Sequence, residues 1–318
     1  MVISTVVRPP SPAHGPLHQR RADKATHIHD SGTDRVFLVF AYMVLAVFFL
    51  AVFLPLLNVV ANSFSAPAAV NAGRVTFWPV DFSLRGYEKA LSDPQIMSGF
   101  LHSLLYTGVG TILAVVLTVC IAYPLSRRDF WGRSVISMAI VFTMLFAGGI
   151  IPTYLVVRQL GLLNTPFAMI LPQACGVWQV IIAMAFFRST IPEDLYEAAQ
   201  LDGASDIGFL VRVVVPLSKP VLAVIALMYA VSSWNSYFDA MLYLQNPSLW
   251  PLQLVLRNVL ILNQSTPSMS ATEVLERQQL ADLLKYSVMV IASVPLLVVY
   301  PFVARHFTQG VMLGAIKG

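Results

Sequence analysis

Long apolar stretches separated by short polar segments dominate this sequence. A helix rises about 1.5 Å per residue and needs about 20 mainly apolar residues to cross a hydrocarbon core of roughly 30 Å. Strands of a membrane barrel are excluded, because they span about 10 residues and alternate apolar with polar positions. The pattern therefore predicts an all-α polytopic membrane protein with six transmembrane helices. These helices are expected at residues 36–60, 99–125, 134–157, 166–187, 221–244 and 284–307.

Composition supports a membrane protein and orients it. Only 11% of the residues are charged and 57% are hydrophobic, whereas about a quarter are charged in an ordinary soluble domain. The net charge of +4 does not indicate a nucleic-acid partner, because the basic residues are spread over short loops. With the N-terminus inside, thirteen of the 20 Lys and Arg residues lie in cytoplasmic segments. This asymmetry predicts a multi-pass plasma-membrane protein with both termini in the cytoplasm.

The segment between the fourth and fifth predicted spans, residues 191–220, has the local signals of two short helices joined by a break. Pro192 suits a first helical position, and the acidic residues after it favour the positive end of a helix dipole. Gly203 permits the backbone reversal that ends the first helix, and Ser205 or Asp206 can cap the second. The second helix is expected to run towards Pro216. The segment therefore predicts a rigid two-helix element on the cytoplasmic side.

This loop resembles the signature of the type I importer permeases of ATP-binding cassette transporters, especially their MalG-like carbohydrate-uptake branch. The signature is Glu-Ala-Ala, three residues, Gly, then about nine residues before Leu-Pro; here Val215 stands in place of the leucine. Segments 123–127, 161–165, 234–238 and 310–318 are similar to the same branch, so the likeness covers most of residues 80–318. The matching loop residues are Glu197, Ala198, Ala199, Asp202, Gly203 and Pro216.

Composition predicts a disordered cytoplasmic tail (1–35), which lies outside the resemblance, and the apolar pattern predicts a first transmembrane helix (36–62) and an extracytoplasmic loop (63–98). The resemblance implies the MetI/MalG-like permease fold for the transmembrane core (99–308), which a cytoplasmic tail (309–318) follows. Within the core, loop 191–220 would form the coupling helix that seats in a cleft on an ATPase subunit. Glu197 would pair with a basic residue of that subunit and Gly203 would shape the loop. The alternative is that Glu197 pairs with Arg188 or Arg212 on a solvated surface.

The same resemblance implies the partners of the chain. They are a second, related permease, two ATP-binding cassette ATPase subunits that hold ATP and Mg, an extracytoplasmic solute-binding protein, and an oligosaccharide substrate. The chain itself has no phosphate-binding loop of the Gly-x-x-x-x-Gly-Lys-Ser/Thr type. We therefore expect a transport subunit without catalytic residues, cofactor or metal of its own, and not an enzyme.

Polar and aromatic residues inside two spans are candidates for the substrate pathway, since sugars are bound by aromatic faces and paired hydrogen-bonding groups. Asp239 is the only acidic residue inside a predicted span, and such a carboxylate faces the protein interior or water. It either hydrogen-bonds sugar hydroxyls or forms an interhelical hydrogen bond near the outer surface. The candidates are Trp178, Trp234, Asn235, Tyr237 and Asp239.

Two other functions remain to be weighed. An ion-coupled secondary transporter would place ionisable groups near the midplane and show broken helices in repeated halves, but the sequence offers only Asp239 and no obvious repeat. A membrane-embedded enzyme would need a metal or nucleophile constellation. His102 and His306 stand alone in or beside different spans, which does not favour that function.

Overall fold

The computed structural model describes residues 32–146, 148–261 and 284–302, and the regular structure of these residues is helical. The only pairing of strand type among them is an isolated bridge between Ser65 and Phe82. The predicted C-terminal tail and almost all of the predicted N-terminal tail lie outside the described residues.

The chain divides into two units, residues 1–54 and 55–318. The first unit contains most of helix α1 (Gly32–Ser63), which covers the predicted first span. Its apolar side chains, including Phe40, Phe48 and Phe49, are exposed along its length. A helix that is apolar on all sides suits a lipid environment, so α1 has the properties expected of a transmembrane helix.

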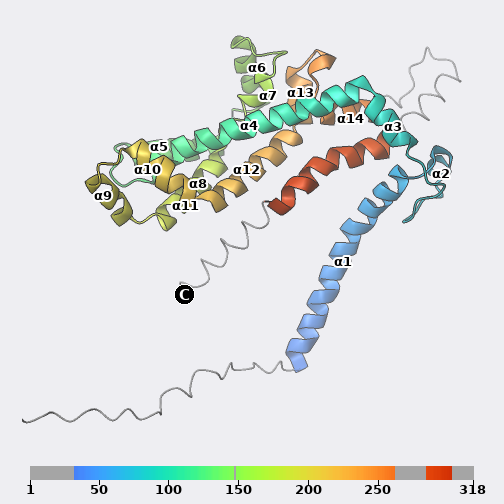
Figure 1. The fold of residues 1–318 in the computed structure, drawn as a ribbon, viewed down its shortest axis with the longest axis horizontal. Coiled ribbons are helices and arrows are strands. Elements are labelled where there is room, and N and C mark those ends of the chain that lie inside the picture. The colour runs from blue at the N-terminus through green and yellow to red at the C-terminus, as the bar shows by residue number, and fades with distance from the viewer. Residues whose placement is uncertain (1–31, 147, 262–283, 303–318) are drawn as a thin grey trace, which may run out of the picture. The chain divides into compact units, whose positions relative to one another are not determined.

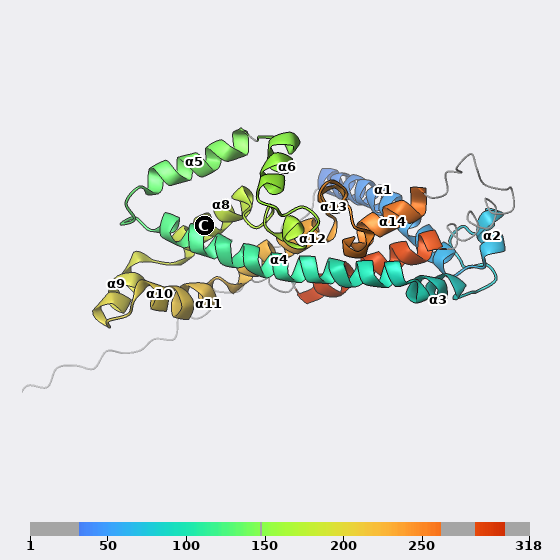
Figure 2. The ribbon, with the colours of Figure 1, turned by 90° about the horizontal axis from the view of Figure 1, so that it is seen from above.

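The second unit is organised around α4 (Pro94–Ser126), which covers the predicted second span. Asp93 caps this helix by accepting hydrogen bonds from the backbone N–H groups of Gln95 at 2.8 Å and Ile96 at 3.2 Å. Helices α8 (Val177–Thr190) and α12 (Lys219–Trp234) lie along α4 (Figures 1 and 2). Helix α14 (Leu252–Ile261) also packs on α4.

Shorter helices and one further long helix complete this unit. Helices α9, α10 and α11 lie near the C-terminal end of α4 (Figure 2). Those three form the loop that the sequence singles out. The remaining elements are α2 (Pro67–Asn71), α3 (Arg85–Ser92), α5 (Arg133–Leu145), α6 (Ile150–Gln159), α7 (Phe167–Ile170), α9 (Glu193–Leu201), α10 (Asp206–Phe209), the π-helical turn η1 (Leu210–Val214), α11 (Val215–Leu217), α13 (Tyr237–Tyr243), the 3-10 turn η2 (Pro247–Leu249) and the helix Leu284–Phe302.

Three of the six predicted spans are interrupted, a feature that the sequence pattern did not predict. The third span is divided into α5 and α6, bent by 114°, and Gly149 has φ 85° immediately before α6. The fourth is divided into α7 and α8, and the fifth into α12 and α13. Among the described residues, 3 helices are long and apolar enough to cross a membrane, or up to 5 if each bent pair is one span.

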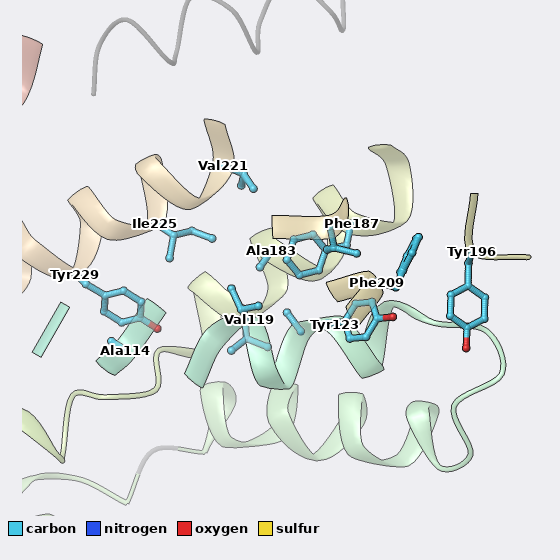
Figure 3. Packing of buried hydrophobic residues seen from close by; sticks show 13 residues of the cluster. Ala114, Val119, Tyr123, Ala183, Phe187, Tyr196, Phe209, Val221, Ile225 and Tyr229 are labelled. Atoms are coloured by element: carbon cyan, nitrogen blue, oxygen red, sulfur yellow. The ribbon is translucent and has the colours of Figure 1, made fainter. Parts of the chain in front are cut away.

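One buried cluster joins the membrane helices to the loop helices. Val119 and Tyr123 of α4, Phe187 of α8 and Ile225 of α12 share it with Tyr196 of α9 and Phe209 of α10 (Figure 3). Inside it, the hydroxyls of Thr118 and Tyr229 are 2.8 Å apart, and the Gly176 N–H donates to the Tyr229 oxygen at 2.9 Å. These bonds satisfy polar groups that would otherwise be costly to bury. The loop is therefore continuous with the helical core.

Candidate functional site

The loop 191–220 begins with a helical hairpin made of α9, a tight turn and α10. Gly203, just after α9, has φ 76°, and a Cβ placed on it would meet nothing within 4 Å. Glycine is therefore required at position 203 because of the backbone conformation and not because of a lack of space. The N–H of Gly203 donates to the carbonyl of Gln200 at 3.0 Å, and that of Ala204 to Ala199 at 2.9 Å. This is a Schellman helix end, and it confirms the predicted reversal at Gly203.

Ser205 starts the second leg of the hairpin, as predicted. Its hydroxyl oxygen accepts a hydrogen bond from the N–H of Gly208 at 3.1 Å and caps α10. The leg then departs from the regular helix that the sequence predicts, because the π-helical turn η1 separates α10 from α11. Pro216 explains the change: it has no N–H to donate to the carbonyl of Arg212, so a regular α-helical bond is missing there.

Tyr196 connects the hairpin to the end of α4, and the sequence did not single it out. Its ring lies edge-on to Phe209 with centroids 5.4 Å apart, and the guanidinium carbon of Arg127 lies 3.2 Å from its centroid. Its hydroxyl donates to Asp206 Oδ1 at 2.6 Å and accepts from Gln200 Nε2 at 2.8 Å. We call the set Arg127, Tyr196, Gln200 and Asp206 the tyrosine clamp. The hydrogen bond to Asp206 raises the pKa of Tyr196 above its ordinary value.

The signature residues on the other side of α9 are open to solvent. Glu197, Ala198, Asp202 and Gly203 are exposed, whereas Ala199 is half-buried against the core cluster. The described ion pairs do not include Glu197, and Arg188 instead donates to the carbonyl of Leu125 at 2.7 Å. The alternative pairing of Glu197 with Arg188 or Arg212 is therefore not formed in the described part of the chain.

Two apolar side chains accompany these polar ones on the exposed part of the hairpin. Leu201 at the end of α9 is 89% exposed and Ile207 in α10 is 75% exposed. Both leave apolar surface exposed on the hairpin that also carries the exposed Glu197 and Asp202, although Tyr196 and Phe209 of the same helices are buried. The hairpin thus has buried side chains that belong to the core and exposed ones that include both apolar and acidic groups.

The five predicted pathway residues have different surroundings in the described part of the chain. Trp234 is 2% exposed, and its indole N–H donates to the carbonyl of Ala292 at 3.0 Å. Asn235 donates to the Val231 carbonyl at 2.8 Å at the end of its own helix. Trp178 and Tyr237 are exposed, at 59% and 43%. Within the described chain, their role in a substrate pathway stays a prediction.

Asp239 differs from the other four because another span binds its carboxylate. It is half-buried in α13, and Oδ2 accepts a hydrogen bond from Nε2 of Gln173. Gln173 lies in the break between α7 and α8, which the sequence pattern did not reveal. Gln173 also lines a small cavity of about 10 Å³ with Tyr229 and Ser233. The two broken spans therefore meet through polar groups at the break between α7 and α8 and in the first turn of α13.

Comparison with known proteins decides the family. A model of the family described as binding-protein-dependent transport system inner membrane component matches residues 114–313. The chain belongs to this family. Members are inner membrane components of transport systems, which confirms the predicted membrane protein and the assignment as a transport subunit and not an enzyme.

Individual relatives of this permease cover nearly its whole length. Protein LplC of Bacillus subtilis is 40% identical over 92% of this chain and 98% of that protein. The polygalacturonan/rhamnogalacturonan transport system permease protein YtcP of Bacillus subtilis is 39% identical over 90% and 99%. A chain in the crystal structure of a bacterial ABC transporter involved in the import of the acidic polysaccharide alginate is 34% identical, with a TM-score of 0.80 over 87% of this chain and 98% of that chain. The likeness confirms the type I importer permease fold.

Proposed function

We propose that this chain is the permease subunit of an ATP-driven importer that carries oligosaccharide into the cytoplasm. The observation that carries the proposal is the hairpin α9–α10, which is built into the core on one face and open on the other. A coupling element must pass the movement of an ATPase to the membrane helices, and a flexible loop would absorb that movement. The Schellman turn, the Ser205 cap and the tyrosine clamp give the hairpin the required stiffness.

The proposed docking face consists of Glu197, Ala198, Leu201, Asp202 and Ile207. Apolar contact with Leu201 and Ile207 would supply binding energy, and Glu197 would pair with a basic residue of the ATPase. Two ATPase subunits, which bind ATP and Mg, would each hold one coupling hairpin of a permease pair. This requires the hairpin and both termini to lie in the cytoplasm, as the distribution of basic residues predicts.

A second permease is proposed because the polar groups at the breaks of the described spans enclose too little space for a sugar. Ligand pockets occupy roughly 300–1,000 Å³, whereas the cavity beside Gln173 is about 10 Å³. Asp239, together with Trp178, Trp234, Asn235 and Tyr237, would then contribute to a pathway that the partner completes. An extracytoplasmic binding protein would deliver the substrate to that pathway, and the family description supports this by calling such transport systems binding-protein-dependent.

We further propose that the oligosaccharide contains acidic sugars. The support comes from two relatives of this chain: one is named for polygalacturonan and rhamnogalacturonan transport, and the other belongs to an importer of the acidic polysaccharide alginate. Uronate oligosaccharides are therefore the substrates to test first, with neutral oligosaccharides of the same length as the comparison.

The decisive experiment co-expresses the tagged chain with its ATPase, partner permease and binding protein, and measures co-purification and substrate-stimulated ATP hydrolysis. Glu197→Lys reverses a charge on the docking face and is expected to reduce both. Glu88→Lys is the matched control, because Glu88 is an exposed acidic residue of α3, at the other end of α4. Normal co-purification and stimulation of Glu197→Lys would contradict docking through this face. Uptake driven by an ion gradient without ATP would contradict the importer mechanism itself.

A further inference from the structure

Four arginines gather where α4 and α8 end and α5 begins. They line a hollow of about 450 Å³ between α4, α8 and the start of α9, and the only acidic residue in its lining is Glu193. Three of them also line an adjoining hollow of about 1180 Å³. We call the smaller space the arginine hollow; its basic residues are Arg127, Arg128, Arg133 and Arg188.

Two of these arginines have no acidic partner among the described residues. Arg133 donates to the carbonyl of Arg127 at 3.1 Å, and Arg188 donates to the carbonyl of Leu125 at 2.7 Å. Arg127 is paired with Asp129 at 3.2 Å. Arg128 lies 3.5 Å from Glu193, and both side chains are largely exposed, so this pair contributes little and can be exchanged for another anion. The hollow therefore has an excess of positive charge held in position by the backbone at the end of α4.

The adjoining hollow has mainly apolar surface, although Asp129 and Asp206 also belong to its lining. Phe130, Trp131, Val135 and Ile136 contribute to it, and Trp131 is 94% exposed. These residues follow directly on the apolar α4 and begin the apolar α5. Aromatic residues of this kind are enriched at the level of lipid headgroups, and basic clusters at the cytoplasmic ends of spans attract anionic lipids. A basic hollow beside an apolar one matches a ligand with an anionic head and an acyl chain.

We infer that the arginine hollow binds the headgroup of an anionic phospholipid of the cytoplasmic leaflet, with its acyl chain along the hollow that contains Trp131. Arg133 and Arg188 contact the phosphate, and the Arg128 side chain exchanges its contact with Glu193 for one with the phosphate. The inference rests on the cytoplasmic placement of this end in the proposed function. A soluble phosphate would satisfy the arginines but would leave Trp131, Val135 and Ile136 without a partner, so the lipid is the occupant to which the geometry points.

The bound lipid would also affect coupling. Tyr196 lines the larger hollow, and Pro192 and Glu193 line the smaller one, so the lipid would touch the base of the hairpin and the ends of two membrane helices at once. Binding in this position stabilises the hairpin against the core. We therefore expect anionic lipid to increase ATPase coupling in the assembled importer.

The test measures binding of phosphatidylglycerol and phosphatidylcholine to the assembled importer by native mass spectrometry, with inorganic phosphate as a separate arm. Each basic side chain near a membrane surface contributes about fivefold to binding of an anionic lipid, so Arg133→Gln with Arg188→Gln should weaken phosphatidylglycerol binding roughly thirtyfold. Arg133→Lys with Arg188→Lys should retain most of it. The control is Arg85→Gln with Arg158→Gln, which removes the same charge at exposed positions outside the hollow.

Equal binding of the two lipids by the wild-type importer, or equal loss in the control pair, would overturn the inference. Phosphate that displaces phosphatidylglycerol at millimolar concentration would show an ion site and also overturn it. Co-purification with the ATPase is recorded for each variant, since loss of lipid with intact assembly separates this site from the docking face. If the glutamine pair does not fold, the lipid preference of the wild type and the lysine pair still decide the question.

Discussion

Replacement of Tyr196 by phenylalanine isolates the contribution of the tyrosine clamp to hairpin stiffness. The ring would keep its contacts with Phe209 and Arg127, but the bonds to Asp206 at 2.6 Å and Gln200 at 2.8 Å would be lost. A hydrogen bond to a charged group contributes about 1.5–3 kcal/mol and a neutral one about 0.5–1.5 kcal/mol. Asp206 is exposed and regains water, so we expect the hairpin to lose about 2 kcal/mol, at the low end of the combined range.

The loss should appear as faster hydrogen exchange of the α9 and α10 amides in the reconstituted permease. A change of about 2 kcal/mol increases the locally opened population roughly thirtyfold. Measurement at pH 7 keeps the phenol neutral, because its pKa is raised from an ordinary value of about 10. The stabilisation is therefore fully present below that ordinary pKa and is lost only as the pH rises through the raised pKa.

A matched variant and an internal reference make this prediction refutable. Tyr87→Phe also removes a bonded hydroxyl, one that donates to Ser63 at 2.8 Å far from the hairpin in sequence, and should leave exchange of α9 and α10 unchanged. Amides in the middle of α4 serve as the internal reference. Wild-type exchange of the hairpin in Tyr196→Phe would refute the reasoning, because the hydroxyl would then contribute nothing to its stability.

Three other substitutions, one of them with a matched control, test separate parts of the structure. Gly99→Val should lower stability by about 1–3 kcal/mol in thermal unfolding, because a Cβ there would lie 3.0 Å from Val255 Cγ2. A Cβ at Gly108 would meet nothing within 4 Å, so Gly108→Val should be tolerated better. Ser205→Ala removes the cap of α10 and should cost about 1 kcal/mol, seen as faster exchange confined to the second leg of the hairpin. Asp239→Ala should change sugar uptake more than assembly, and unchanged uptake kinetics would remove it from the pathway.

The continuous helices could be predicted because the length of an apolar stretch determines whether it can cross the bilayer. A span such as α4 needs enough consecutive apolar residues to cross the bilayer, and this is visible in the sequence without any partner. The turn at Gly203 and the Ser205 cap could also be predicted from the sequence, since each depends on the conformation or hydrogen bonding of a few neighbouring residues. The signature residues could be placed on a coupling loop only through the family resemblance.

The breaks within the third, fourth and fifth spans could not be predicted from hydropathy. The residues at these breaks are surrounded by apolar sequence, so the mean hydropathy around them stays high although the helix stops. Polar groups at or beside two of the breaks are satisfied by tertiary hydrogen bonds. The Gly176 N–H donates to the Tyr229 oxygen, and Gln173 donates to the Asp239 carboxylate. Backbone and side-chain groups freed at a break are tolerated inside a membrane protein only when such partners exist.

The tyrosine clamp shows the same limit at the functional site. Tyr196 lies directly before the signature glutamate, yet its importance depends on Arg127, which belongs to the end of a helix two spans earlier. A single sequence gives no sign that these residues meet. The signature therefore marks the face of the hairpin that would contact another protein, whereas the inner face is fixed by contacts that only the folded chain reveals. Both faces would be needed for the proposed coupling, because a hairpin that binds an ATPase but moves independently of α4 would transmit no force to the membrane helices.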